Sequence, residues 1–511
     1  MSTVIRIAIF LSLLIYITNE MSAQTSLKEI GLEMGAYQVG FKYYQTADST
    51  RTYRMENEFS NRVMYRPMPI SIWYPAKAAK ATPLTVLDYL EVLKEEEEWE
   101  YVPNRFLLDW FPYLWNTPEN HKHLSEQATA ISGAEMLKQE FPVVIYTPSY
   151  QASSIENFAL CEYLASHGYF VISSPSRGTK SRKLEGGTTK DMETQSGDVA
   201  FLLKEVHRYP SAYLKNIALV GFSFGGLSNV ITVMKRPDVK AVVSLDGTER
   251  YKFTTLEASP YYQIKEFDIP YVHFAQKDIP EEVLKSEKLP KGINSEFQFY
   301  DSLIHSTAYR YKFNDLTHSY FSSFGVLFAS RDKRQDKSDA QIMKSYNLMA
   351  KRTLQFLDAF LLGDPKARQF MENSPAENGI SKDLLLKQMK KPLEKPFTYK
   401  DFNDLAYQQN YEDLIALYEA KKKKYPKLHL KERMLNTLGL WLSFDPERNA
   451  EGIRVLLLAL HLYPESANLY DSLAEAYLAG GNTKNAIINF KKSLERSPDN
   501  QNALDRLKEL R

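Results

Sequence analysis

The chain has 511 residues, too many for a single hydrophobic core, so we expect at least two domains. Its hydrophobic fraction of 44% and charged fraction of 25% are those of an ordinary globular protein. The formal net charge of +1 argues against a nucleic acid or an anionic membrane as the main partner.

The N-terminus has the pattern of a secretory signal peptide. Arg6 precedes an apolar run over residues 7–17, and the small residues Ser22 and Ala23 follow. The run is shorter than the roughly 20 apolar residues that a membrane-spanning helix needs. We therefore expect residues 1–23 to be removed and the mature protein, without a membrane span, to be exported to a periplasm or to the extracellular space.

The next segments predict strands followed by a helical insertion. Residues 37–77 alternate and turn in the manner of strands, whereas residues 85–140 are helical and rich in aromatic residues such as Trp99 and Trp115. The insertion is expected to supply a lid or an apolar wall for a binding site. The alternative is that its aromatic residues are core residues that cover a sheet edge.

From residue 141 short apolar runs alternate with helical segments. This alternation is typical of a parallel sheet covered by helices on both faces, so we expect a doubly wound α/β domain. A long amphipathic helix ending near residue 364 closes it, which gives a domain over residues 24–365. The expected strands lie in "FPVVIYTPS", "YFVISSPSRG", "NIALVGFS", "VKAVVSLDG", "IPYVHFAQKD" and "AYRYKFNDLTH".

The C-terminal part differs from the rest of the chain. Residues 366–398 are predicted to be a linker, and residues 399–511 an all-helical domain of tetratricopeptide-like repeats. The clearest unit spans residues 467–500 and has the repeat's residue types at Tyr470, Leu473, Ala474, Tyr477, Gly481, Ala486, Phe490 and Pro498.

A Gly-x-Ser-x-Gly motif spans residues 221–225, with Ser223 at its centre. An apolar strand precedes it and a helical segment follows, which is the context of a nucleophile elbow. Small neighbours are needed because the serine of such an elbow sits in a strained turn. We therefore expect Ser223 to be a nucleophile.

A serine nucleophile needs a histidine base. Of the nine histidines, His318 follows the last predicted strand, and His305 is the second choice. The acid is left open between Asp246 and Asp278, which end successive predicted strands, while Asp315 lies too close to His318 in sequence. The order serine, acid, histidine is that of the α/β-hydrolases.

The chain from about residue 35 to residue 364 resembles the platelet-activating-factor acetylhydrolase and dienelactone-hydrolase-like branch of the α/β-hydrolases. The resemblance lies in "MPISIWYPA", in "GFSFGG", in "VVSLDG" and in "LTHSYFSSF". In that acetylhydrolase family the acid follows the strand after the nucleophile, in a Leu-Asp step. The resemblance therefore implies Asp246 as the acid.

These residues suggest roles in an acyl-transfer reaction. His318 would take the Ser223 proton, and Asp246 would fix the histidine tautomer. The backbone N–H groups of Phe224 and Tyr150 are expected to bind the oxyanion.

We expect a serine hydrolase that cleaves carboxylic esters, with acetyl, short-acyl or lipid esters as substrates and no metal or cofactor. The alternatives are a peptidase or amidase with the same triad, and a non-catalytic interaction protein that works through its repeats. The repeat domain is also where a protein partner or a second copy would bind.

Overall fold

The computed structural model describes residues 25–57, 60–97, 101–110, 116–286, 288–328 and 336–510. The expected signal peptide, residues 1–23, lies outside these ranges, as do Trp99 and Trp115 of the insertion. The chain divides into two compact units, which are Met1–Leu393 and Glu394–Arg511. No described helix is both long and apolar enough to cross a membrane.

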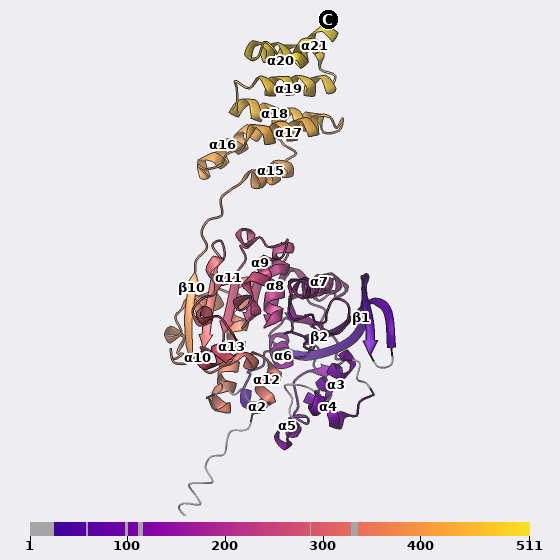
Figure 1. Ribbon diagram of the computed structural model, residues 1–511, viewed down its shortest axis with the longest axis vertical. Helices are drawn as coiled ribbons and strands as arrows, with labels where there is room; N and C mark the ends of the chain where they lie inside the picture. Colours follow the sequence, from indigo (N-terminus) through magenta and orange to yellow (C-terminus); the bar gives the residue numbers. More distant parts are fainter. Residues whose placement is uncertain are drawn as a thin grey trace, which may run out of the picture. The chain divides into compact units, whose positions relative to one another are not determined.

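Unit 1 is built on one sheet with the strand order β10-β9-β8-β7-β6-β4-β5-β2-β1-β3 over the described residues (Figure 1). From β9 to β5 neighbouring strands pair in parallel, whereas β10, β2 and β1 pair antiparallel to their inner neighbours. The strands are β1 (Gln38–Asn57), β2 (Ser60–Ala76), β3 (Ile131–Ser132), β4 (Phe141–Thr147), β5 (Phe170–Ser173), β6 (Ala212–Phe222), β7 (Ala241–Leu245), β8 (Tyr271–Ala275), β9 (Ala308–Phe313) and β10 (Leu385–Lys390).

The central strands are buried on both faces, as the continuous apolar runs of the sequence predict. Every residue of β4, β7 and β8 is buried. Because side chains alternate along a strand, Val144 and Tyr146 enter one core while Val143 and Ile145 enter the other. The expectation of a doubly wound α/β fold is confirmed.

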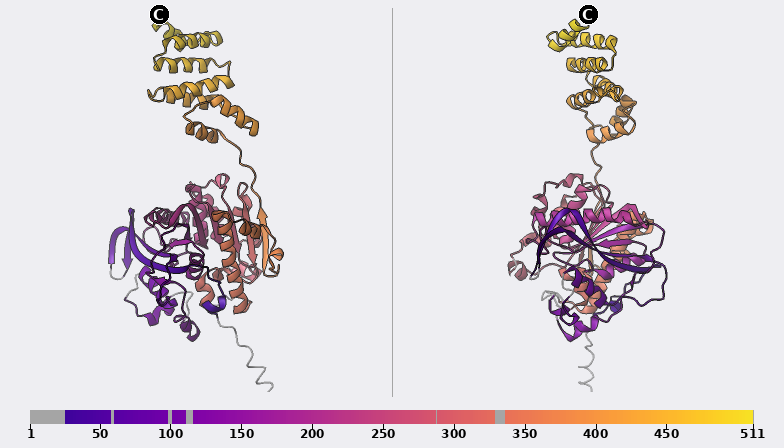
Figure 2. Two further views of the ribbon diagram at one scale, coloured as in Figure 1. Left: turned by 180° about the vertical axis from the view of Figure 1, so that it is seen from behind. Right: turned by 90° about the vertical axis from the view of Figure 1, so that its right-hand side faces the viewer.

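Two groups of helices cover the two faces of the sheet (Figure 2). The first core contains side chains of α2 (Leu27–Ile30), α3 (Val86–Glu96), α4 (Leu107–Trp110), α6 (Phe158–Ser166), α12 (Ser323–Leu327), α13 (Asp339–Leu357) and α14 (Pro365–Glu372). The second contains those of α7 (Thr189–Glu205), α8 (Phe224–Lys235), α9 (Phe253–Glu257) and α11 (Gln298–Ser302). Two further short helices are α5 (Pro118–His123) and α10 (Glu281–Ser286).

The described part of the insertion packs as core. Tyr89 of α3 is fully buried, accepts a hydrogen bond from the Trp73 indole N–H at 2.9 Å and stacks on Phe158 with ring centroids 4.5 Å apart. Leu90 and Leu93 are buried beside it. These residues of the insertion therefore serve as core residues that cover the sheet, which is the second of the two interpretations given above.

The predicted linker over residues 366–398 is wrong for most of its length. Residues 365–372 form α14, and residues 385–390 form β10, which pairs antiparallel with β9. Met371 and Leu385 are buried in the first core. The strand was missed because it is short, lies at the sheet edge and mixes apolar residues with lysines and a glutamine without regular alternation, so its sequence looks like a polar connector.

Unit 2 is all-helical over its described residues and consists of helices that pack in consecutive pairs. Close contact is possible where the sequence supplies glycine: a Cβ on Gly452 would lie 2.4 Å from the backbone nitrogen of Ser443 on the paired helix. The helices are α15 (Tyr399–Gln408), α16 (Leu414–Lys424), α17 (Glu432–Ser443), α18 (Asn449–Leu462), α19 (Ala467–Ala479), α20 (Thr483–Arg496) and α21 (Gln501–Glu509).

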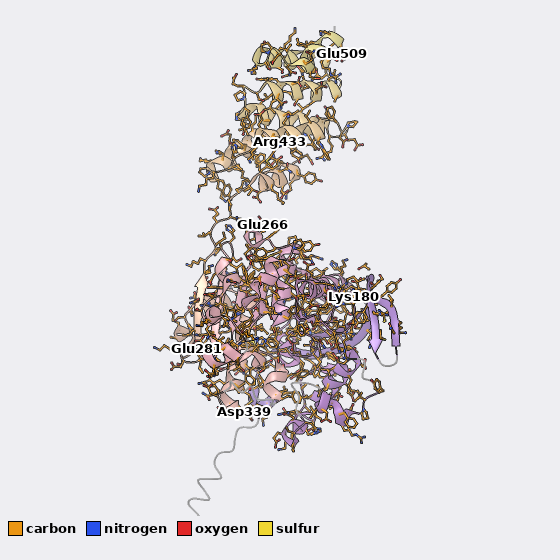
Figure 3. All side chains as sticks on the ribbon, in the orientation of Figure 1. Lys180, Glu266, Glu281, Asp339, Arg433 and Glu509 are labelled. Atoms are coloured by element: carbon orange, nitrogen blue, oxygen red, sulfur yellow. The ribbon has the colours of Figure 1, made fainter. Side chains whose placement is uncertain are left out.

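Charged side chains of both signs lie at the surface of both units. Lys180 and Glu281 of unit 1 and Arg433 of unit 2 are exposed examples (Figure 3). This mixture agrees with the net charge of +1.

The position of β10 predicts where unit 1 ends. A chain that stops after residue 393 should keep the melting temperature of unit 1, whereas one that stops after residue 365 should be destabilised. Loss of the buried Met371 and Leu385 removes roughly 1.5–3 kcal/mol for each side chain. Thermal unfolding of the two truncated chains measures the difference, and equal melting temperatures would show that β10 is dispensable.

Candidate active site

Ser223 lies in a sharp turn between β6 and α8. Its backbone has φ 52° and ψ −117°, a conformation that few residues other than glycine adopt. The turn is tied to the neighbouring strand because the Ser223 N–H donates to the Leu245 carbonyl at 3.0 Å. Ser223 is thereby the N-cap of α8, with its hydroxyl at the carboxyl edge of the sheet.

The two glycines of the motif are required by close contacts. A Cβ on Gly225 would lie 2.0 Å from the carbonyl oxygen of Thr147 at the end of β4. A Cβ on Gly221 would lie 2.5 Å from the backbone carbon of Gly225. Both distances are shorter than any side chain tolerates, so the backbone can make this turn only with glycine at these positions.

Three of the residues selected from the sequence form one hydrogen-bonded chain. The Ser223 Oγ lies 2.8 Å from His318 Nε2, and His318 Nδ1 lies 2.6 Å from Asp246 Oδ2. An ionised Asp246 can only accept, so Nδ1 carries the proton and leaves Nε2 free to accept from the Ser223 hydroxyl. This is the tautomer that a general base needs.

Asp246 is fully buried at the end of β7 and has a positive φ of 40°. Its carboxylate accepts hydrogen bonds from the Gln276 N–H at 3.0 Å and from the Tyr251 hydroxyl at 2.8 Å. The side-chain Oε1 of Gln276 accepts from the His318 backbone N–H at 3.1 Å, so Gln276 contacts both members of the pair, one through its backbone and one through its side chain. Gln276 and Tyr251 could not be identified from the sequence, because neither belongs to a motif.

The charge state of Asp246 follows from its neighbours. Burial alone raises the pKa of a carboxyl group, but here the hydrogen bond and the charge of His318 outweigh it and place the pKa of Asp246 well below its ordinary value. The Arg250 guanidinium, 3.4 Å from Asp246 Oδ1, acts in the same direction. Asp246 is therefore ionised at neutral pH.

The other candidates lie elsewhere. Asp278 is exposed and pairs with Lys312 at 2.8 Å. The side chain of His305 lies on the surface and contacts the Leu393 carbonyl at 3.0 Å. Asp315 is buried but accepts from the Ser345 hydroxyl at 3.2 Å. None of them contacts Ser223 or His318 in the described structure.

A pocket of about 120 Å³ opens beside Ser223 and His318. Tyr150 lines it, and no hydrogen-bond acceptor among the described residues binds the Tyr150 N–H. Phe224 is the first residue of α8, where a backbone N–H has no partner within the helix. The two amides proposed as oxyanion donors thus have no acceptor among the described residues.

Two buried acids that the sequence did not single out lie next to this pocket. Glu156 lines the pocket and accepts from the Ser149 N–H at 2.9 Å. Glu96, the last residue of α3, accepts from the Ser154 N–H at 3.1 Å and from the hydroxyls of Ser153 and Ser154. Burial raises the pKa of each acid to about 7, and the hydrogen bonds only partly oppose this effect.

No cluster of three or more potential metal ligands occurs among the described residues. His121 and His123 lie on α5. His123 is buried, with Nδ1 2.5 Å from Glu126 Oε1.

A solved structure similar to this chain is that of a ferulic acid esterase from Streptomyces cinnamoneus. The TM-score is 0.50 at 18% sequence identity, and the similarity covers 70% of this chain and 99% of the other. No protein-family model and no curated protein matches the sequence. Together with the strand order, the likeness shows that the chain combines an α/β-hydrolase fold with an all-helical C-terminal region.

The raised pKa values of Glu96 and Glu156 predict how stability changes with pH. Since the folded pKa of about 7 exceeds the ordinary value of 4.5, their contribution to stability is complete below 4.5 and is lost as the pH rises through 7. At 1.36 kcal/mol per pKa unit the loss is about 3 kcal/mol for each group.

Glu156→Gln should therefore lose less unfolding free energy between pH 5 and pH 8 than the wild type, by about 2–3 kcal/mol. Urea unfolding at the two pH values measures this change. Glu135→Gln, at an exposed position, is the control and should behave as the wild type does. An equal loss in Glu156→Gln and the wild type would contradict the prediction.

Proposed function

We propose that the protein is a serine hydrolase that cleaves carboxylic esters through an acyl-enzyme. The single observation that carries the proposal is the hydrogen-bonded chain of Ser223, His318 and Asp246 beside an open pocket. The esterase activity named for the structural neighbour agrees with this proposal. The resemblance to the acetylhydrolase branch favours acetyl, short-acyl or lipid esters.

Each residue has a defined role in the proposed reaction. As Ser223 Oγ attacks the ester carbonyl carbon, its proton passes to His318 Nε2, and the negative charge develops on the carbonyl oxygen. The N–H groups of Phe224 and Tyr150 bind that oxygen. The bond to the alcohol breaks as His318 returns the proton to it. Water then repeats the sequence and releases the acid.

The surroundings of the triad also support the proposal. Asp246 is ionised and fixed by Gln276 and Tyr251, so it can stabilise the imidazolium that forms on His318. The Thr248 hydroxyl lies 3.4 Å from Ser223 Oγ and contacts the nucleophile from the side of η3 (Thr248–Arg250). We further propose, from residues 1–23, that the enzyme acts after export.

Substitution of each candidate acid tests the assignment of Asp246 to the triad. Asp246→Asn should lower kcat on p-nitrophenyl acetate by about 10³–10⁴-fold, because the amide favours the wrong tautomer of His318. Asp278→Asn is the matched control and should retain wild-type turnover. A fluorophosphonate probe should label Ser223 in the wild type but not in Ser223→Ala.

The same measurements separate the alternatives. Absence of labelling at Ser223 in folded protein would overturn the enzyme proposal. Turnover of amides without turnover of p-nitrophenyl esters would favour a peptidase or amidase. Loss of activity in Asp278→Asn with full activity in Asp246→Asn would show that the acid is misassigned.

For unit 2 we propose a binding role, with a protein partner or a second copy as the ligand. The proposal rests on two residues of α17, Met434 and Trp441, and on its C-cap residue Phe444, which are 40%, 82% and 60% exposed. Their spacing of seven and three residues places them on one side of the helix. Exposed apolar groups that cluster in this way are typical of interaction sites.

This proposal predicts separate effects on binding and turnover. Trp441→Ser combined with Phe444→Ser should abolish concentration-dependent association in sedimentation velocity and leave ester hydrolysis unchanged. Wild-type protein that sediments as a monomer at every concentration would exclude the second copy as the ligand.

A further inference from the structure

The turn that follows β4, residues 148–157, carries the Tyr150 N–H that we propose as an oxyanion donor. Such a donor contributes only if it is held in position before the charge develops. From other segments of the chain, the Ser176 N–H donates to the Ala152 carbonyl at 2.9 Å and the Phe324 N–H donates to the Glu156 carbonyl at 3.3 Å. Both contacts lie on the C-terminal side of Tyr150, and side chains supply further support.

The carboxylate of Glu156 binds the first part of the turn. It accepts from the Ser149 N–H at 2.9 Å and from the Ser149 hydroxyl at 2.5 Å. These contacts fix Ser149, the residue immediately before Tyr150. The next N–H along the chain, that of Tyr150, has no acceptor among the described residues, and Tyr150 lines the pocket.

The carboxylate of Glu96 binds the second part of the turn. It accepts from the Ser154 N–H at 3.1 Å and from both serine hydroxyls of the Ser153-Ser154 pair. The Ser154 hydroxyl also lies 2.8 Å from that of Ser71 in β2. Arg177 donates to the backbone carbonyl of Glu96 and fixes the end of α3.

Both acids are buried, and burial of a carboxylate opposes folding. An apolar residue at either position would avoid this cost but would leave the N–H groups of Ser149 and Ser154 unpaired. Each acid thus lies where it accepts a hydrogen bond from a backbone N–H group of the turn. Glu96 reaches it only because α3 packs Tyr89, Leu90 and Leu93 into the core.

We propose that Glu96 and Glu156 are positioning residues, which together hold the 148–157 turn so that the Tyr150 N–H faces the oxyanion. The helical insertion then acts in catalysis by delivering Glu96 to the turn. This inference rests on the proposed hydrolase function, since an oxyanion forms only during acyl transfer.

The test compares alanine and glutamine at each position. Glu156→Ala and Glu96→Ala should lower kcat on p-nitrophenyl acetate by about 10²-fold, the effect of losing one oxyanion donor, with KM within about threefold of the wild type. The affinity for an aryl trifluoromethyl ketone, which forms a tetrahedral adduct with the nucleophile, should fall in parallel. Glu156→Gln and Glu96→Gln should restore most of the activity, because an amide oxygen still accepts from the turn.

Glu162→Ala is the matched control. Glu162 is a buried acid that accepts from the Tyr89 hydroxyl and from the N–H groups of Thr129 and Ala130, so it also ties the insertion to the core, but it does not contact the turn. Its loss should lower the melting temperature and leave kcat and ketone affinity within about threefold of wild type. An equal fall of kcat in Glu162→Ala and Glu96→Ala would overturn the positioning role.

A second variant covers the case in which Glu96→Ala does not fold. Ser153→Ala with Ser154→Ala removes the hydroxyl contacts from the side of the turn and should lower kcat and ketone affinity in the same direction. Unchanged values in a folded double variant would overturn the role of Glu96. If wild-type protein neither labels at Ser223 nor hydrolyses the ester, the proposed function fails. If it does both and the alanine variants at Glu96 and Glu156 match it, only this inference fails.

Discussion

The turn between β6 and α8 brings two backbones closer together than any side chain would allow, and the rest of the site is arranged around that contact. Gly225 lies against the end of β4 at Thr147, which fixes the first turn of α8 relative to two strands at once. Ser223 is held at positive φ as a result, and the Phe224 N–H is left free at the helix start. The position of Ser223 and that of one proposed oxyanion donor therefore follow from one steric constraint.

Around this turn the polar groups form a single connected set. Asp246 accepts from His318, from Tyr251 and from the Gln276 N–H, while the Gln276 side chain returns to the His318 backbone. The buried carboxylate of Asp246 thus has donors from three different segments of the chain. An arrangement of this kind fixes the position and the charge of Asp246 together, because the contacts that orient the carboxylate also lower its pKa.

The alternation of apolar runs with helical segments was enough to predict the fold class, and the strand–turn–helix context was enough to place Ser223 in the turn between β6 and α8. Sequence context could not decide whether Asp246 or Asp278 is the acid, since the two residues follow neighbouring strands at the same edge of the sheet. Only the resemblance to the acetylhydrolase family favoured Asp246. Glu96 and Glu156 could not be predicted, because their importance depends on contacts between segments that no local pattern connects; Glu96 and Ser153 are 57 residues apart. The edge strand β10 was missed for a different reason, its resemblance to a polar connector.

With β10 in place, the sheet of unit 1 is complete before the chain enters the helical unit. The segment between them supplies no strand to the sheet, and the buried residues of the C-terminal helices belong to cores of their own. Removal of the helices downstream of residue 393 therefore opens neither hydrophobic core of unit 1.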